Sequence, residues 1–164
     1  ASLAFDASGA LWVSDVQANT IVKYGSEQLE VSGAPAPDVR LAATDNSLAN
    51  PSGLAFDAAG NLWVANGRQT VISFSVAQLA ASGAPVPHIV LALGPPAVTL
   101  PEGIAFDGDG SLWVISNDGR LAKYDRSSLG ASGAPLPSVR LVLTGYVLFW
   151  SLAFWPAPAG LPMH

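Results

Sequence analysis

Few side chains in this sequence could bind a ligand or carry out chemistry. The sequence has no cysteine, which excludes disulfides, thiolate zinc sites and cysteine nucleophiles. It has two histidines, His88 and His164. Among its carboxylates we single out Glu102, in Pro101-Glu102-Gly103, because a carboxylate can bind a hard cation or transfer a proton. What Glu102 can do depends on the elements that position it and on the side chains beside it.

Those elements belong to an internal repeat. The stretch Gly-Leu-Ala-Phe-Asp-Ala-Ala-Gly-Asn-Leu-Trp-Val at 53–64 returns as Gly-Ile-Ala-Phe-Asp-Gly-Asp-Gly-Ser-Leu-Trp-Val at 103–114, and the chain opens on a similar copy at 2–13. A shorter copy, Ser-Leu-Ala-Phe-Trp, occupies 151–155. We therefore expect one propeller segment with blades at 1–50, 51–100 and 101–149, an extra first strand at 150–156 and a C-terminal tail at 157–164.

Each repeat is predicted to form four short strands, at 53–57, 62–65, 70–75 and 88–93 in the second copy. An Asp-x-x-Gly sequence after the first strand marks a tight turn, in which the Asp accepts backbone N–H groups and the Gly adopts a positive φ. Four short strands in roughly 40–50 residues are typical of a propeller blade. The sequence thus predicts an all-β propeller of four-stranded antiparallel blades with an incomplete ring, since a ring needs about 4–8 blades.

The signature Gly-(Leu/Ile)-Ala-Phe-Asp-x-x-Gly-x-Leu-Trp-Val resembles the blade of NHL-repeat proteins. It is also close to the six-bladed propellers of the gluconolactonase-like group and to the virginiamycin B lyase type. The resemblance covers essentially the whole chain and implies a fold rather than an activity, because one fold hosts many activities. It also implies, weakly, a secreted or periplasmic location, on which the sequence is otherwise silent.

The strand order decides which side chains share one end of the blades. The start of the first strand and the turn between the second and third strands lie together, at the end that we call the channel face. The Asp-x-x-Gly turn lies at the opposite end. Seven candidate ligand-binding residues are expected on the channel face: Asp15, Ser52, Asn66, Arg68, Glu102, Asn117 and Arg120.

The resemblance implies a divalent-metal role for the position of Glu102, because gluconolactonase-like proteins bind a metal through residues directly before the first-strand Gly. The matching positions here are Ala1, Ser52 and Trp150, which are poor ligands for a hard cation. Since a calcium site needs about six oxygens or more, we expect no cofactor, and Glu102 would be part of an incomplete site only. A calcium-type ion would need ligands from further blades.

Other motifs are read structurally. The Asp-Gly-Asp-Gly-Ser run at 107–111 resembles the start of a calcium loop but lacks its later ligands, so we predict a turn. No catalytic residue is assigned. Neither histidine lies near a plausible nucleophile, and no first or second strand carries a histidine. The recurring tryptophans are expected to pack between neighbouring blades: Trp12, Trp63 and Trp113.

A Ser-Gly-Ala-Pro-x-Pro stretch begins at Ser32, Ser82 and Ser132. Pro-x-Pro can be a ligand for an aromatic groove. Its place in every repeat favours a connector instead, whose glycine permits a sharp turn and whose prolines discourage the fourth, outermost strand from pairing with another sheet.

The formal net charge of −5 and the scattered basic residues argue against a nucleic-acid partner. The longest apolar run, at 141–155, is interrupted and shorter than the about 20 residues of a membrane span, so no span is expected. The expected partners are a polypeptide or a small polar ligand, with missing blades of the same chain or a second copy to close the ring.

We therefore expect a non-catalytic binding or scaffold module whose site is the channel face. The alternative is part of a divalent-metal-dependent lactonase or hydrolase of the gluconolactonase type, with its remaining ligands in missing blades.

Overall fold

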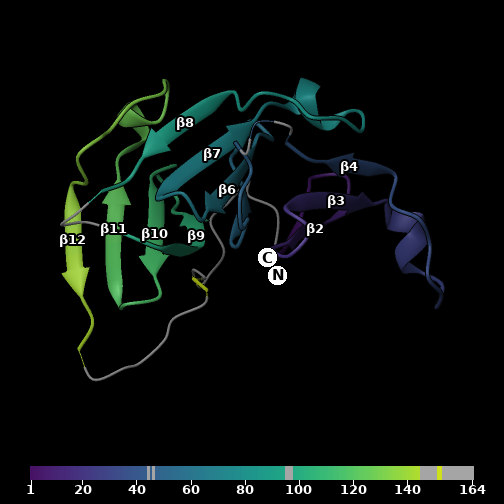
Figure 1. Cartoon of the computed structure of the whole chain (residues 1–164), viewed down its shortest axis with the longest axis horizontal. Helices are drawn as coiled ribbons and strands as arrows, with labels where there is room; N and C mark the ends of the chain where they lie inside the picture. The colour runs from purple at the N-terminus through teal and green to yellow at the C-terminus, as the bar shows by residue number, and fades with distance from the viewer. Residues whose placement is uncertain (44, 46, 95–97, 145–150, 153–164) are drawn as a thin grey trace.

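Three four-stranded antiparallel sheets follow one another in an open arc (Figure 1). The computed structural model describes residues 1–43, 45, 47–94, 98–144 and 151–152. The first sheet contains β1 (Leu3–Phe5), β2 (Leu11–Asp15), β3 (Thr20–Tyr24) and β4 (Val39–Leu41). The second contains β5 (Leu54–Phe56), β6 (Leu62–Asn66), β7 (Thr70–Phe74) and β8 (Ile89–Ala92). The third contains β9 (Pro101–Phe106), β10 (Leu112–Ser116), β11 (Arg120–Tyr124) and β12 (Val139–Val142).

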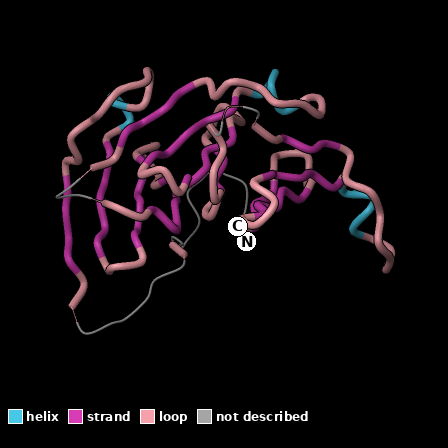
Figure 2. The backbone as a smooth tube through the Cα atoms, viewed as in Figure 1, coloured by secondary structure: helices cyan, strands magenta, loops and turns pink. Residues whose placement is uncertain are grey.

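Each sheet keeps its strands in chain order, which confirms the prediction of antiparallel propeller blades. Short 3₁₀ helices that the sequence did not predict lie between the third and fourth strands: η1 (Ser26–Leu29), η2 (Val76–Leu79) and η3 (Arg126–Ser128), drawn in cyan in Figure 2. Within the described residues, no helix has the length and apolar character needed to cross a membrane.

The Asp-x-x-Gly turns form as predicted. In the second blade, Asp57 Oδ1 accepts the backbone N–H groups of Ala59 and Asn61, both at 2.9 Å, and Gly60 has a φ of 82°. The sequence did not predict a further bond, in which Asp57 Oδ2 accepts the indole N–H of Trp63 at 2.9 Å. The same bond recurs in the first and third blades at 2.9 Å, so each turn aspartate also fixes the tryptophan of its blade.

The fixed tryptophans pack between blades. Trp12 meets Phe56 of the next blade edge to face, with ring centroids 6.1 Å apart, and Trp63 meets Phe106 in the same way at 5.8 Å. Edge-to-face pairs add roughly 0.5–1.5 kcal/mol beyond the area they bury. The predicted packing role is thus confirmed at these two junctions.

The Ser-Gly-Ala-Pro-x-Pro connector does not keep the outer strand unpaired, so that expectation was wrong. Gly83 N donates to Arg40 O and Ala42 N donates to Gly83 O, both at 3.0 Å, while Ser82 Oγ accepts Arg40 N at 3.0 Å. The serine and glycine of one blade thus pair in parallel with the outermost strand of the preceding blade, and we call this arrangement the clasp. Its prolines follow the pairing residues, so the missing N–H groups do not interfere.

The clasp recurs at the second junction, where Gly133 pairs with β8 and Ser132 Oγ accepts Val90 N at 3.0 Å. Gly83 and Gly133 do not adopt the positive φ that a sharp turn would have required.

The predicted extra first strand at 150–156 falls mostly outside the described residues, as does the tail at 157–164. Of it, Ser151 and Leu152 are described, without strand structure. A Cβ on Gly103 would lie 2.8 Å from Ser151 Cα, just as one on Gly53 would lie 3.0 Å from Gly103 Cα. Ser151 therefore lies beside the third blade where the first strand of a following blade would begin.

Candidate functional site

The channel face contains a cavity of about 270 Å³. The first strands and the turns after the second strands meet there, as the strand order predicted. Two of the seven predicted residues line it, Ser52 and Glu102. The other lining residues were not predicted: Ala1, Ser2, Val16, Asn50, Gly67, Leu100 and Pro101.

Glu102 is the titratable side chain of this cavity. It lies near the start of β9 and is half-buried. Burial raises the pKa of its carboxyl group, and the amino group of Ala1 opposes that rise only in part. A carboxylate in such a place is a poorly solvated acceptor, which a donor or a cation from a ligand would stabilise.

Ser52 is held in place by backbone groups of two blades. Its Oγ lies 2.9 Å from Pro101 O and 3.3 Å from Ala65 O. Its own carbonyl accepts the hydroxyl of Ser14 at 2.8 Å. Ser52 therefore joins the blades at the cavity wall, and its hydroxyl oxygen can still accept a hydrogen bond from a ligand.

Two predicted residues have structural partners instead. Asp15 Oδ1 caps its own turn by accepting Gln17 N and Ala18 N, both at 3.0 Å. Asn66 is buried at the end of β6, where its Oδ1 accepts Ala49 N at 2.7 Å. The Asn66 amide group also donates to Ser47 O and Thr70 Oγ1, at 3.1 and 2.9 Å. These bonds hold the loop before the second blade, so Asn66 is not presented to the cavity.

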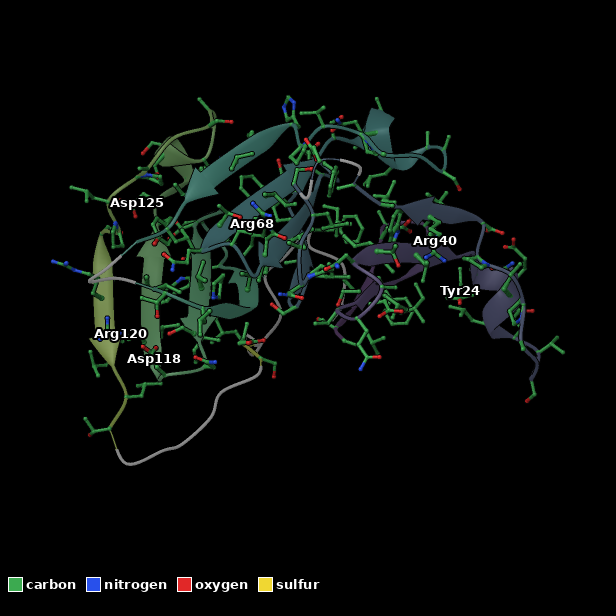
Figure 3. All side chains as sticks on the ribbon, viewed as in Figure 1. Tyr24, Arg40, Arg68, Asp118, Arg120 and Asp125 are labelled. Carbon is green, nitrogen blue, oxygen red and sulfur yellow. The ribbon has the colours of Figure 1, made fainter. Side chains whose placement is uncertain are left out.

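The remaining predicted residues lie outside the cavity lining. Arg68 lies in the turn between β6 and β7, and Figure 3 shows Arg120, at the start of β11, beside Asp118. Arg120 Nε lies 3.2 Å from Asp118 Oδ2 in a half-exposed ion pair. Asn117 donates its backbone N–H to Leu100 O at 3.3 Å.

The sequence signal that could have found Asn50 is its place directly before Pro51, which matches the place of Leu100 before Pro101 in the next repeat. Asn50 adopts a positive φ of 49°, and its N–H donates to Asn19 Oδ1 of the preceding blade at 2.6 Å. A Cβ on Gly67 would lie 2.8 Å from Asn50 Cβ, so the glycine is needed for this close approach.

A resident metal ion is not supported by the side chains described. Among the described residues, no group of three or more His, Cys, Asp and Glu side chains is placed to hold one. The Asp107 turn holds backbone N–H groups, as predicted, with Asp107 Oδ1 accepting Asp109 N at 3.1 Å and Ser111 N at 2.9 Å.

The repeated sheets, the inter-blade tryptophans and the clasps define a segment of a β-propeller. No protein-family model and no curated protein matches the sequence. Among solved structures, the chain is similar to a streptogramin B lyase, with a TM-score of 0.59 and 14% identity over 87% of this chain and 40% of that one.

It is also similar to virginiamycin B lyase from Staphylococcus aureus, with a TM-score of 0.59 and 13% identity over 88% of this chain and 41% of that one. A catalytically inactive variant of that lyase with quinupristin gives a TM-score of 0.58 and 13% identity over 89% of this chain and 42% of the other. At these identities the likeness shows the fold alone. The chain spans about two fifths of the length of these structures.

Proposed function

We propose that the chain is a non-catalytic propeller module that binds a polypeptide or a small polar ligand at the channel face. The observation that supports this most is the 270 Å³ cavity in which Glu102 and Ser52 meet. Pockets that take whole drug-sized ligands usually have roughly 300–1,000 Å³. A cavity slightly below that range suits one side chain or one small polar molecule.

The chemistry of the cavity favours a ligand that donates hydrogen bonds. Glu102 supplies an acceptor whose ionised form is disfavoured by burial, and Ser52 supplies a fixed hydroxyl. Leu100 and Pro101 add apolar wall. A donor group on an apolar stem matches this combination.

The test is a ¹⁵N NMR titration with N-acetylated amino-acid amides and simple sugars. We expect at least one probe to shift the amide signals of Ser52, Gly67 and Glu102, and Glu102→Gln to weaken that response. Arg68→Gln, outside the cavity, is the matched control and should leave it unchanged. If none of these signals moves with any probe, the binding proposal is wrong.

The two end faces support the proposal that further blades, or a second copy, complete the assembly. Leu54, inside the arc, is 4% exposed, whereas the matching Leu3 of the first blade is 58% exposed. At the other end, Leu141 of β12 is 47% exposed, whereas the clasped Leu41 is 0% exposed. These faces carry the apolar residues of a blade junction without its second half.

The sequences at the two ends also match a junction. β12 begins with Val-Arg-Leu, the same tripeptide as β4, which Ser82 and Gly83 clasp. The first blade carries the equivalent Ser32 and Gly33, with no preceding outer strand among the described residues to pair with. A second copy could therefore join head to tail through a contact already present twice in the chain.

Crosslinking tests the second-copy proposal directly because the chain has no cysteine of its own. A mixture of Ser32→Cys and Arg140→Cys chains, treated with bismaleimidoethane, should give a crosslinked dimer that neither chain gives alone. The double variant Arg40→Cys/Ser82→Cys, which places the pair within one chain, is the positive control. No dimer from the mixture, with the control crosslinked, would exclude head-to-tail joining of copies.

The metal-dependent lactonase alternative rests on Glu102 alone among the described residues. Calorimetric titration with Ca²⁺ tests it, since a site of this kind would give binding that Glu102→Gln abolishes. Lyase activity is not proposed, because the likeness to the lyases shows the fold and spans two fifths of their length.

A further inference from the structure

The first and third blades each hold a lysine ammonium between an indole ring and a carboxylate. In the third blade, Lys123 Nζ lies 5.5 Å from the Trp113 ring centroid and 3.0 Å from Asp107 Oδ2. In the first blade, Lys23 Nζ lies 5.7 Å from the ring of Trp12 and 3.7 Å from the turn carboxylate. Both lysines pair directly with the tryptophan across the second and third strands. The blade therefore has a standard place for an ammonium group, where a ring face and a negative charge both attract it.

The second blade has serine at the lysine position. Ser73 pairs with Trp63 on one side and with Ile89 on the other, so the three residues share one face of the sheet. The side chain of Ser73 is 0% exposed, and among the described residues its Oγ has no hydrogen-bond partner. A buried hydroxyl without a partner is unusual and calls for an explanation.

A second cavity, of about 370 Å³, lies beside the neighbours of that serine, although the fully buried Ser73 does not itself line it. Trp63 and Ile89, the two neighbours of Ser73, both line it. It lies between the second and third blades at the end that carries the Asp-x-x-Gly turns, opposite the channel face. Trp63 and Asp57 correspond to the indole and the carboxylate that hold the lysine ammonium in the other two blades, and both border this open space.

The charges around this cavity favour a cation. Asp57 lines it, and the donors to Asp57 Oδ2 among the described residues are neutral: the indole N–H of Trp63 and the amide of Asn61, both at 2.9 Å. The amide thus replaces the ammonium as a hydrogen-bond donor but leaves the carboxylate charge unneutralised. Asp107 and Asp109 also line the cavity, Asp107 being paired with Lys123 at 3.0 Å. The guanidinium of Arg126 adds one positive charge, and the imidazole of His88 completes the titratable lining.

We propose that this cavity binds a primary alkylammonium group, from a lysine side chain of a partner polypeptide or from a free polyamine. The ammonium lies over Trp63 and beside Asp57, in the place that Lys23 and Lys123 fill in the other blades. The alkyl stem lies along Phe106 and Ile89. This site is independent of the channel-face proposal, because the two cavities share no lining residue.

The test uses NMR titration of the whole chain with Nα-acetyl-lysine methylamide and with 1,5-diaminopentane. Both probes should shift the indole N–H signal of Trp63. The signal of Trp12 should stay unchanged, because Lys23 already fills the ammonium position beside that ring. The norleucine analogue, which lacks the ammonium, should have no effect. Tighter binding of the lysine derivative would indicate a polypeptide source, and tighter binding of the diamine a free polyamine.

The decisive variant is Ser73→Lys, which supplies the ammonium from within the chain. It should weaken binding of both amines at least tenfold, whereas Val31→Lys, which adds the same charge at an exposed site of the first blade, should not. The proposal is wrong if neither amine moves the Trp63 signal, if the norleucine analogue binds equally well, or if Ser73→Lys binds as the wild type does. Should Ser73→Lys fail to fold, the wild-type comparison of Trp63 with Trp12 decides the question.

Discussion

The repeat supplies a matched pair of substitutions that measures what one blade junction contributes to stability. Phe56 and Phe5 occupy the same position of successive repeats. Phe56 is 1% exposed and packs against Trp12, whereas Phe5 on the end blade is 37% exposed. Replacing each by alanine therefore removes the same atoms from a closed junction and from an open face.

The expected costs differ clearly. Truncation of a fully buried phenylalanine costs about 3–5 kcal/mol, because transfer and cavity terms add. For Phe5, water can fill the space that is left, so only part of the roughly 1.5–3 kcal/mol for burying such a side chain is lost, about 1–2 kcal/mol. Phe56→Ala should thus lower the free energy of unfolding by about 2 kcal/mol more than Phe5→Ala.

Urea unfolding followed by far-UV circular dichroism measures both costs. Each variant is measured at a protein concentration at which size-exclusion chromatography shows a monomer, so that a partner copy cannot cover the open face. Trp12 emission should shift to longer wavelength in native Phe56→Ala, because its ring loses that contact. Equal costs for the two variants in a monomer would refute the assignment of Phe5 to an open junction.

Three further outcomes follow from the contacts described. Glu102→Gln should raise the free energy of unfolding at neutral pH and not near pH 3. Burial raises the pKa of Glu102, so the folded protein becomes less stable as pH rises from the ordinary pKa of the group through its folded pKa. Chemical unfolding at both pH values checks this. Burial raises the pKa of Asp107, but hydrogen bonds from Trp113, Lys123 and Ser111 N outweigh burial and lower the pKa overall. The stability that this lowered pKa contributes is present above the ordinary Asp pKa and is lost as pH falls through the folded pKa. Asp107→Asn should therefore be less stable than the wild type at pH 7, and the two should converge in an acid titration. Ser82→Ala should cost about 0.5–1.5 kcal/mol by removing the acceptor for Arg40 N, whereas Ser32→Ala should cost nothing measurable in the monomer, and thermal unfolding of the two variants tests the difference.

The fold could be predicted because the sequence repeats its turn and core residues. Asp-x-x-Gly specifies a local turn through contacts within four residues, and the structure forms it in all three blades. The clasp could not be predicted from the same reasoning. It joins the Ser82 hydroxyl and the Gly83 backbone to backbone groups at 40 and 42, and such backbone partners leave no trace in side-chain type.

The candidate site was predictable only in part, for a related reason. Strand order was enough to bring Ser52 and Glu102 to one cavity. It did not show that the Asn66 amide would be used by the loop at 47–49, because the loop binds it through backbone groups, which residue types do not mark. The sequence shows serine at 73 where the other two blades have lysine. That this position lies beside Trp63 follows only from the strand register of the structure.

The clasps also set the range of contacts along the chain. Each clasp joins a serine to a strand 42 residues earlier, and among the described residues no side-chain hydrogen bond joins positions more than 52 apart. A blade therefore needs only its immediate neighbour to complete its bonding, and its outer strand is secured only after the next repeat has been made. During synthesis from the N-terminus, folding would advance one repeat behind the growing end. A chain arrested at residue 75 should leave the amides of Arg40 and Ala42 open to hydrogen exchange, and one arrested at residue 92 should protect them.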